Sequence, residues 1–228
     1  MSIKVIIPAY NEEASIAKVI SEIPSEVDEI IVVNNNSTDG TKENAARAGA
    51  TVLDEERKGY GYACLKGMDY IAGLENQPTV IVFLDGDYSD YPEELIEVVR
   101  PIVEDDIDLV IGSRVKERRE YGAMTPQQIF GNWLATKLMR LFFGANFTDL
   151  GPFRAIKYDK LLYLQMEDKT YGWTVEMQLK AIKKGLSYTE VPVRYKNRIG
   201  VSKVSGTVKG SVLAGMKILT WIFKYSFK

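Results

Sequence analysis

The first 113 residues alternate short apolar runs with helical stretches, and no other feature of the sequence limits the fold as much. The apolar runs are rich in Val and Ile and predict strands at 3–7, 29–33, 51–53, 80–84 and 108–112. The stretches between them predict helices at 12–23, 38–48, 61–73 and 92–103. Continuous apolar strands joined through helices are typical of a parallel sheet covered on both faces. The sequence therefore predicts an α/β fold, a mostly parallel sheet flanked by helices.

The second half of the chain is less regular. It predicts helices at 127–143, 173–184 and 205–228, and strands at 153–158 and 187–193. The longest uncharged run of the last helix, 210–216, has seven residues, whereas about 20 are needed to cross a bilayer. Lysines stand there beside Trp221 and Phe223, which is typical of an amphipathic helix on a membrane surface. The alternative is a terminal helix packed on the core.

Composition and charge exclude several kinds of site. The chain has no His and one Cys, Cys64, which excludes Ser-His-Asp and Cys-His catalysis, His-ligated zinc and an internal disulfide. Residues 1–113 hold 23 acidic and 8 basic side chains, and residues 114–228 hold 8 and 21. This polarity indicates that the two halves bind different partners. Nucleic acid is not expected, because the pI is about 5.5 and the basic half is rich in apolar residues.

Two carboxylates, Asp85 and Asp87, directly follow the predicted strand 80–84. In parallel sheets, ligands bind outside the carboxyl ends of the strands. The two carboxylates, with Asp90 nearby, would repel one another there unless a cation is bound. Oxygen ligands without His or Cys favour Mg²⁺ or Mn²⁺. We therefore predict a divalent metal on Asp85 and Asp87; a turn or helix cap is the alternative.

Polar segments follow the other strands at the same edge of the predicted sheet. Segment 8–12, Pro-Ala-Tyr-Asn-Glu, offers a ring and two polar side chains for a base and ribose. Segment 34–40 has three consecutive amides, which suit a planar heterocycle. The glycines of segment 58–61, Lys-Gly-Tyr-Gly, let the backbone approach a ligand, although the P-loop pattern is missing. An Asx turn or helix cap is the alternative for the first two segments.

These motifs occur in the order found in family 2 glycosyltransferases, and the chain most resembles the polyprenyl-phosphate sugar transferases of the dolichol-phosphate mannosyltransferase type. The resemblance covers about residues 3–204 and also includes 112–114, 148–154, Glu176 and 198–203. It implies a GT-A fold with a Rossmann-like sheet, a nucleotide-sugar donor, a divalent cation, inversion at the anomeric carbon and a lipid-phosphate acceptor. The implied domains are a catalytic domain, 1–204, with a donor and metal half, 1–113, and an acceptor half, 114–204, followed by the amphipathic helix 205–228.

The resemblance also implies roles for single residues. Those expected to bind the nucleotide sugar are Pro8, Tyr10, Glu12, Asn34, Asn35, Asp39, Lys58, Gly61, Asp85 and Gly86. Those expected to hold the acceptor phosphate are Arg114, Asn132, Arg154, Arg198 and Lys203. Those expected to act in catalysis are Asp85, Asp87, Arg114 and Glu176.

Three features depart from the family pattern. An Asp pair is usual where Asn34 and Asn35 stand, so the donor base, UDP or GDP, stays open. Ser89 stands where the family has a glutamine metal ligand. The transmembrane segments that often follow the catalytic domain do not appear in this sequence. The amphipathic helices 127–143 and 205–228 and the basic tail after Glu190 predict contact with the membrane surface, and a separate membrane-anchoring subunit is a further candidate partner.

The acceptor decides whether the reaction needs a general base. A phosphate monoester, with a second pKa near 6, is already anionic at neutral pH and needs none. A sugar or protein hydroxyl must lose a proton during attack, and Glu176 or Asp149 would then be the base. A third alternative is a non-catalytic nucleotide-binding scaffold on the membrane. The expected location is the cytoplasmic face of the membrane, because Met1 leads into an apolar strand without a signal peptide.

Overall fold

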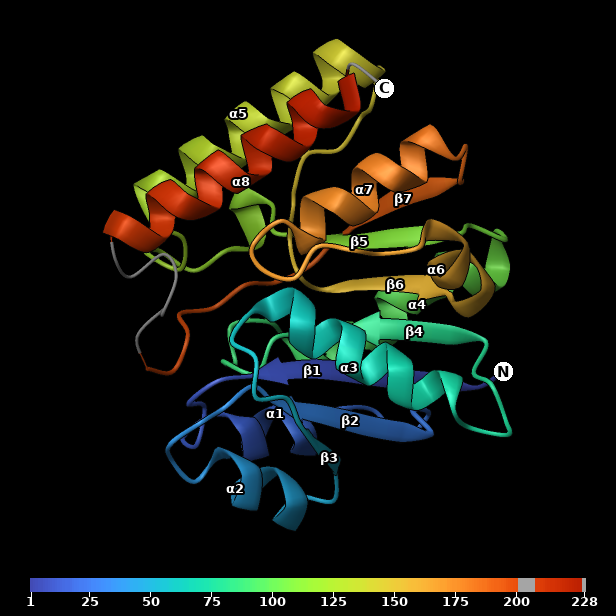
Figure 1. The fold of residues 1–228 in the computed structure, drawn as a ribbon, viewed down its shortest axis with the longest axis vertical. Helices are drawn as coiled ribbons and strands as arrows, with labels where there is room; N and C mark the ends of the chain where they lie inside the picture. Colours follow the sequence, from blue (N-terminus) through green and yellow to red (C-terminus); the bar gives the residue numbers. More distant parts are fainter. Residues whose placement is uncertain (201–207, 227–228) are drawn as a thin grey trace.

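The computed structural model of the chain describes residues 1–200 and 208–226. Within them, seven strands form one sheet in the order β3-β2-β1-β4-β6-β5-β7 (Figure 1). The strands are β1 (Ile3–Ala9), β2 (Glu29–Asn34), β3 (Thr51–Asp54), β4 (Val80–Phe83), β5 (Leu109–Ser113), β6 (Arg154–Lys157) and β7 (Tyr188–Pro192). All seven strands predicted from the sequence are present, with ends shifted by a few residues.

The sheet is parallel except at one strand. Strands β3, β2, β1 and β4 run parallel to one another, and β7 runs parallel to β5. Strand β6 lies between β4 and β5 and is antiparallel to both. The predicted α/β fold with a mostly parallel sheet is therefore confirmed.

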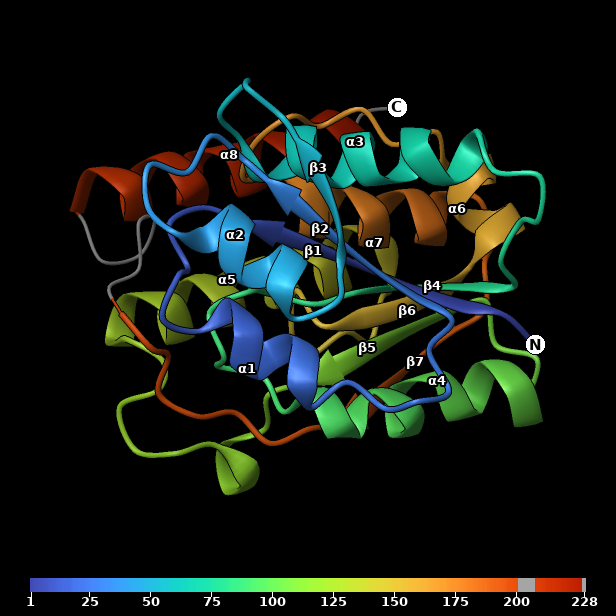
Figure 2. The same ribbon diagram turned by 90° about the horizontal axis from the view of Figure 1, so that it is seen from below.

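Helices cover both faces of the sheet (Figure 2). They are α1 (Ile16–Ser21), α2 (Thr41–Arg47), α3 (Tyr60–Ala72), α4 (Leu95–Glu104), α5 (Pro126–Phe143), α6 (Tyr158–Leu164), α7 (Trp173–Lys183) and α8 (Val208–Ser226), with short 3₁₀ turns η1 (Pro92–Glu94) and η2 (Lys116–Arg118). Successive side chains of a strand point to opposite faces of the sheet. Ile6 therefore belongs to the hydrophobic cluster with α3 and α7, whereas Ile7 belongs to the cluster with α1 and α4. Helix α6 was not predicted; it begins at Tyr158, where the predicted strand 153–158 was expected to end.

Helices α5 and α8 lie side by side on the β5–β7 side of the sheet, far from β3 (Figure 1). Helix α5 starts at a capping box of Thr125 and Gln128 and ends at Gly144, whose φ of 66° suits glycine. Helix α8 also packs on α7 and buries Trp221 and Ile222 in the core, as the packed-helix alternative predicts. Its other face is exposed. In the described ranges we find no helix with enough length and apolar character to pass through a bilayer.

Candidate functional site at the carboxyl edge of the sheet

The loops that follow β1, β2 and β4 meet at the carboxyl ends of these parallel strands. Two adjoining hollows lie there. The first, of about 310 Å³, is lined by residues of both halves of the chain: Pro8, Ala9, Tyr10, Glu12, Asn35, Lys58, Gly59, Tyr60, Asp85, Gly86, Asp87, Thr170, Tyr171 and Arg198. We call it the donor hollow. The second, of about 640 Å³, extends from it to α5 and α8, and we call it the acceptor hollow. Five residues line both: Tyr60, Asp85, Asp87, Tyr171 and Arg198.

The carboxylates after β4 lack enough positive partners. One buried oxygen of Asp85 has no hydrogen-bond partner, and burial followed by the charge of Asp87 raises the pKa of Asp85 to about 7. Neither oxygen of buried Asp90 has a partner, and burial followed by the charges of Asp85 and Asp87 raises the pKa of Asp90. Asp90 lies outside both hollows. This excess negative charge fits a bound cation at Asp85 and Asp87.

The side chain of Asp87 already has local partners. Its Oδ1 accepts from the backbone N–H of Ser89 at 2.9 Å and from the Ser89 hydroxyl at 2.5 Å. Its Oδ2 lies 2.9 Å from Nη1 of Arg198. Ser89 therefore orients Asp87. Among the described residues, no group of three acidic, His or Cys side chains could enclose a metal, so a metal would also need oxygens of solvent or ligand.

Arg198 lies at the centre of the site, more than 100 residues away from Asp87 in the sequence. Its Nη2 donates to Oε1 of Glu12 at 2.8 Å, while Nη1 faces Asp87. The backbone N–H of Ile199 donates to the Asp87 carbonyl at 3.0 Å, which holds this segment against the β4 loop. The structure thus places Arg198 where a phosphate beside the metal could meet it; its role stays a prediction.

In the amide-rich loop after β2, the side chains of Asn34 and Asn35 bond to other parts of the protein. Asn34 Nδ2 donates to Asp54 at 2.9 Å. Asn35 Nδ2 donates to the Glu55 and Arg57 carbonyls, and its Oδ1 accepts from the Gly59 N–H at 2.9 Å. These contacts favour the turn alternative over direct base recognition for both asparagines, although Asn35 borders the donor hollow.

Two further predicted donor residues serve the fold. Asp39 accepts from the N–H groups of Thr41 and Glu13 in the turn that leads into α2, and it does not line the donor hollow. A Cβ on Gly61 would lie 2.0 Å from the Asp168 carbonyl oxygen. The close approach that this glycine permits is therefore to the protein's own backbone and not to a ligand. Pro8, Tyr10, Glu12, Lys58 and Gly86 do line the donor hollow.

Three predicted acceptor residues line the acceptor hollow: Arg198, described above, Arg114 and Asn132. Arg114 makes a bidentate pair with Asp149, at 2.8 and 2.6 Å, and its guanidinium lies 5.1 Å from the Tyr195 ring centroid. Burial lowers the pKa of Arg114, but Asp149 outweighs this and raises it. Asn132 bridges to the Thr148 carbonyl and the Leu150 N–H. Both side chains face the space that an acceptor would occupy.

Another predicted acceptor residue, Arg154, is structural. Arg154 is buried and donates to the carbonyls of Thr174, Leu150 and Gly151, away from both hollows. Burial lowers the pKa of Arg154 to about 10. The structure therefore does not place this fully buried side chain where it could grip a phosphate. Lys203 lies outside the described residues.

Glu176 is also structural. It is fully buried, accepts from the N–H groups of Glu167 and Asp168, and pairs with Lys180 at 2.7 Å. It lines neither hollow, so the expectation that it acts in catalysis is not met. Its carboxylate is used to position the segment before α7.

Sequence reasoning missed several residues of the site. The Tyr60 hydroxyl is buried without a hydrogen-bond partner, and burial followed by the charge of Asp85 raises the pKa of Tyr60. Its motif, 58–61, was recognised, but the tyrosine within it was not singled out. Thr170 and Tyr171 line the donor hollow from the loop before α7 and carry no sequence signal.

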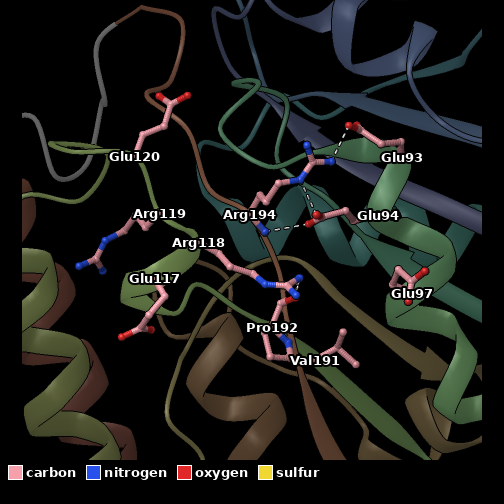
Figure 3. Close-up of a pocket in the computed structure, with 10 residues that line it drawn as sticks. All are labelled: Glu93, Glu94, Glu97, Glu117, Arg118, Arg119, Glu120, Val191, Pro192 and Arg194. Carbon is pink, nitrogen blue, oxygen red and sulfur yellow. Dashed lines mark hydrogen bonds and ion pairs between the residues drawn. The ribbon is translucent and has the colours of Figure 1, made fainter.

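A third hollow, of about 950 Å³, lies between α4, η2 and the end of β7 (Figure 3). Its lining mixes acids and arginines, but these neutralise one another: Arg194 pairs with Glu93 at 2.8 Å and Glu94 at 2.6 Å. Arg118 donates to the Pro192 carbonyl. We assign no site to this hollow, because its arginines are directed at the protein itself.

Comparisons with known proteins agree with this geometry. Residues 4–162 match the family model described as glycosyl transferase family 2. The chain is 32% identical to an undecaprenyl-phosphate mannosyltransferase of Micrococcus luteus, over 95% of this chain and 93% of that protein. It is 30% identical to the low-salt glycan biosynthesis hexosyltransferase Agl6 of Haloferax volcanii, over 92% of this chain but only 51% of that protein.

A solved structure shares the fold. It is glucosyl-3-phosphoglycerate synthase from Mycobacterium tuberculosis in complex with Mn²⁺, UDP-glucose and phosphoglyceric acid, with a TM-score of 0.78 at 21% identity. The match covers 99% of this chain and 80% of that one.

Proposed function

The chain belongs to glycosyl transferase family 2 and has the GT-A fold, and from this premise we propose that it transfers a hexose from a nucleotide sugar to the phosphate of a polyprenyl lipid, with inversion. The observation that carries the proposal is the pair of adjoining hollows that meet at Asp85 and Asp87. One hollow can hold the donor while the other holds an acceptor, and the sugar would pass between them.

The donor hollow suits a nucleoside diphosphate sugar with a divalent cation. Tyr10 offers a ring for the base, with the Lys58 ammonium 5.3 Å from the ring centroid. Asp85 and Asp87 would hold the cation, which neutralises the charge that builds on the departing diphosphate. The unpartnered oxygen of Asp85 supports this assignment, as do solved relatives of the same fold that contain Mn²⁺ or Mg²⁺.

The proposed transfer is a single displacement. An oxygen of the acceptor phosphate forms a bond to the anomeric carbon as the bond from that carbon to the diphosphate oxygen breaks. Arg198 lies beside Asp87 and can meet the leaving diphosphate, and Arg114 faces the acceptor side. No proton has to be removed from the attacking oxygen.

The carboxylates support a phosphate acceptor over a hydroxyl acceptor. Asp149 is held in the pair with Arg114, whose charge and hydrogen bonds outweigh burial and hold the pKa of Asp149 below its ordinary value. Glu176 is paired with Lys180 and lies outside the hollows. Both acids that the sequence offered as a base for an alcohol are therefore occupied.

The position of the acceptor hollow supports a lipid. It reaches α5 and α8, whose outward faces expose Ile129, Phe130, Trp133, Leu141, Phe142, Leu213, Met216 and Phe223. The two faces meet where the rings of Phe142 and Phe223 lie 5.8 Å apart. Lys137, Arg140 and Lys224 are exposed on the same two helices. We propose that this surface, which we call the helix-pair face, lies on the cytoplasmic side of a membrane with anionic lipid.

The test of donor and acceptor has two stages. A thermal-shift screen of UDP-, GDP- and other nucleotide sugars, with and without Mn²⁺ or Mg²⁺, should find one donor that stabilises the protein in a metal-dependent way. Radiolabelled sugar from that donor should then pass to a polyprenyl phosphate but not to the matching polyprenol. No stabilisation by any nucleotide sugar, or equal transfer to the alcohol, would contradict the proposal.

The membrane contact has a separate test. The protein should float with vesicles that contain anionic lipid at low salt, and flotation should weaken as salt is raised. A Phe130→Ser/Trp133→Ser variant should float less, whereas Tyr121→Ser, a matched change of an exposed aromatic outside the helix-pair face, should float as the wild type does. Equal flotation of both variants would show that this face does not bind lipid.

A further inference from the structure

We propose that Asp168 is a positioning residue for donor binding, because it ties the wall of the donor hollow to α8. The inference rests on the proposed function, since it concerns how the nucleotide-sugar site is held. Asp168 does not line either hollow and would not touch substrate. It acts through Thr170 and Tyr171, the two residues that form this wall.

The two oxygens of Asp168 bind in two directions. Oδ1 accepts from the backbone N–H groups of Thr170, at 2.7 Å, and Gly172, at 3.1 Å, which closes the turn that carries the wall. Oδ2 accepts from Nε1 of Trp221 at 2.6 Å and lies 3.0 Å from Nζ of Lys217, both on α8. One carboxylate that is 2% exposed therefore joins the wall to the last helix.

The wall is also pressed against the start of α3. The N–H of Gly61 donates to the Thr170 carbonyl at 3.3 Å, and the N–H of Tyr62 donates to the Lys169 carbonyl at 3.2 Å. A Cβ on Gly59 would lie 2.2 Å from the Lys169 oxygen, so only glycine permits this approach. Tyr60 stands in this same stretch and lines both hollows. A shift of the wall would therefore move the residues around the sugar.

Helix α8 approaches the wall equally closely. A Cβ on Gly172 would lie 2.4 Å from Nε1 of Trp221. Glu176 holds the other end of the segment through the N–H groups of Glu167 and Asp168. The wall thus has a fixed base on α7 and a side that depends on the Asp168–Trp221 bond. Without that bond, the Trp221 N–H would lose its partner and Oδ2 of Asp168 would keep only Lys217 on α8, so the wall would be held less firmly.

Donor affinity, measured by calorimetry with the donor from the screen at saturating Mn²⁺, tests the inference. Trp221→Phe keeps an aromatic ring but removes the N–H donor, and Asp168→Asn keeps the oxygen for the turn but loses the acceptor for Trp221. Each should weaken donor binding about tenfold, and the double variant should be no weaker than Asp168→Asn alone. Tyr163→Phe is the control, because it also removes the polar group of an aromatic side chain, and Tyr163 lies on α6, outside both hollows and outside the helix-pair face.

A general loss of structure would not produce this pattern. Affinity for Mn²⁺ alone should stay within about twofold of wild type, and KM for the donor should rise while kcat changes little. If Asp168→Asn does not fold, Trp221→Phe and Lys217→Met carry the test, since both leave the turn of the wall intact. If Trp221→Phe binds the donor as tightly as the wild type does, the inference is overturned, but the proposed function still stands. Absence of any donor binding by the wild type would instead overturn the proposed function, and the inference with it.

Discussion

Two groups of buried carboxylates in this molecule differ in whether hydrogen-bond donors and cations of the protein surround their oxygens. At the end of β4, one oxygen of Asp85 and both oxygens of Asp90 have no partner, and the pKa of each acid is raised, first by burial and then by neighbouring acids. Before α7, burial would raise the pKa of Asp168, but hydrogen bonds from Thr170, Trp221 and Lys217 outweigh it and lower that pKa. Buried carboxylate oxygens without a partner indicate a place where an external cation can bind. Buried carboxylate oxygens with hydrogen-bond donors and cations around them indicate a structural role.

The largest effect should come from the carboxylates that follow β4, where Asp87 is paired with Ser89 and Arg198 and is also a proposed metal ligand beside Asp85. Asp87→Ala removes a proposed metal ligand, so donor binding and transfer should fall at least about 100-fold. Asp168→Asn should retain transfer at saturating donor, since it acts on donor affinity alone. Assays of both variants over a donor titration compare the two groups directly. Similar kcat losses in the two variants would mean that the distinction between them is false.

Glu176→Gln should instead lower stability. The change leaves Lys180 without its charged partner and places an amide where two backbone N–H groups donate. We expect a loss of about 2 kcal/mol in the free energy of unfolding, measured with urea. The kcat of the folded fraction should stay near that of wild type. Unchanged stability with lost turnover would make Glu176 a catalytic base and favour a hydroxyl acceptor.

Arg198→Ala should separate metal binding from donor binding. In the structure Arg198 is the cation that pairs with Oδ2 of Asp87. Its removal should tighten binding of Mn²⁺ alone by about threefold, since the metal no longer competes with a guanidinium, and weaken binding of the donor diphosphate. Titration of Mn²⁺ followed by electron paramagnetic resonance, with and without donor, measures both. Weaker Mn²⁺ binding in the absence of donor would contradict this expectation.

The last expected effect is a dependence of stability on pH. The pKa of Asp85 is about 7 in the metal-free fold, above its ordinary value of 3.8. The folded state therefore holds a proton that the unfolded state releases, and stability from this group falls as pH rises from about 4 to 7. Urea unfolding of wild type and Asp85→Asn between pH 5 and 8 should show a flatter profile for the variant. Parallel profiles would mean that Asp85 ionises normally.

The sequence predicted well which strand-end residues line the donor hollow, and it predicted poorly where the surrounding polar side chains point. Asp85, Asp87 and Tyr10 follow strands whose apolar runs are unmistakable, so their common edge was predictable. Arg154 and Glu176 stand in motifs of the same apparent quality, yet both face the backbone of the protein. A local pattern does not reveal whether a polar side chain points at a hollow or at a carbonyl.

By itself, the sequence determined the alternation of strands and helices, the acidic strand end, and the absence of histidine chemistry, because each depends on residue type and period along the chain. Only the tertiary structure decided which charges remain unmet, since that depends on contacts across long sequence distances. Arg198 reaches Asp87, and Trp221 reaches Asp168, through packing of the last segments on the first. Burial makes these contacts strong, and burial is a property of the assembled fold.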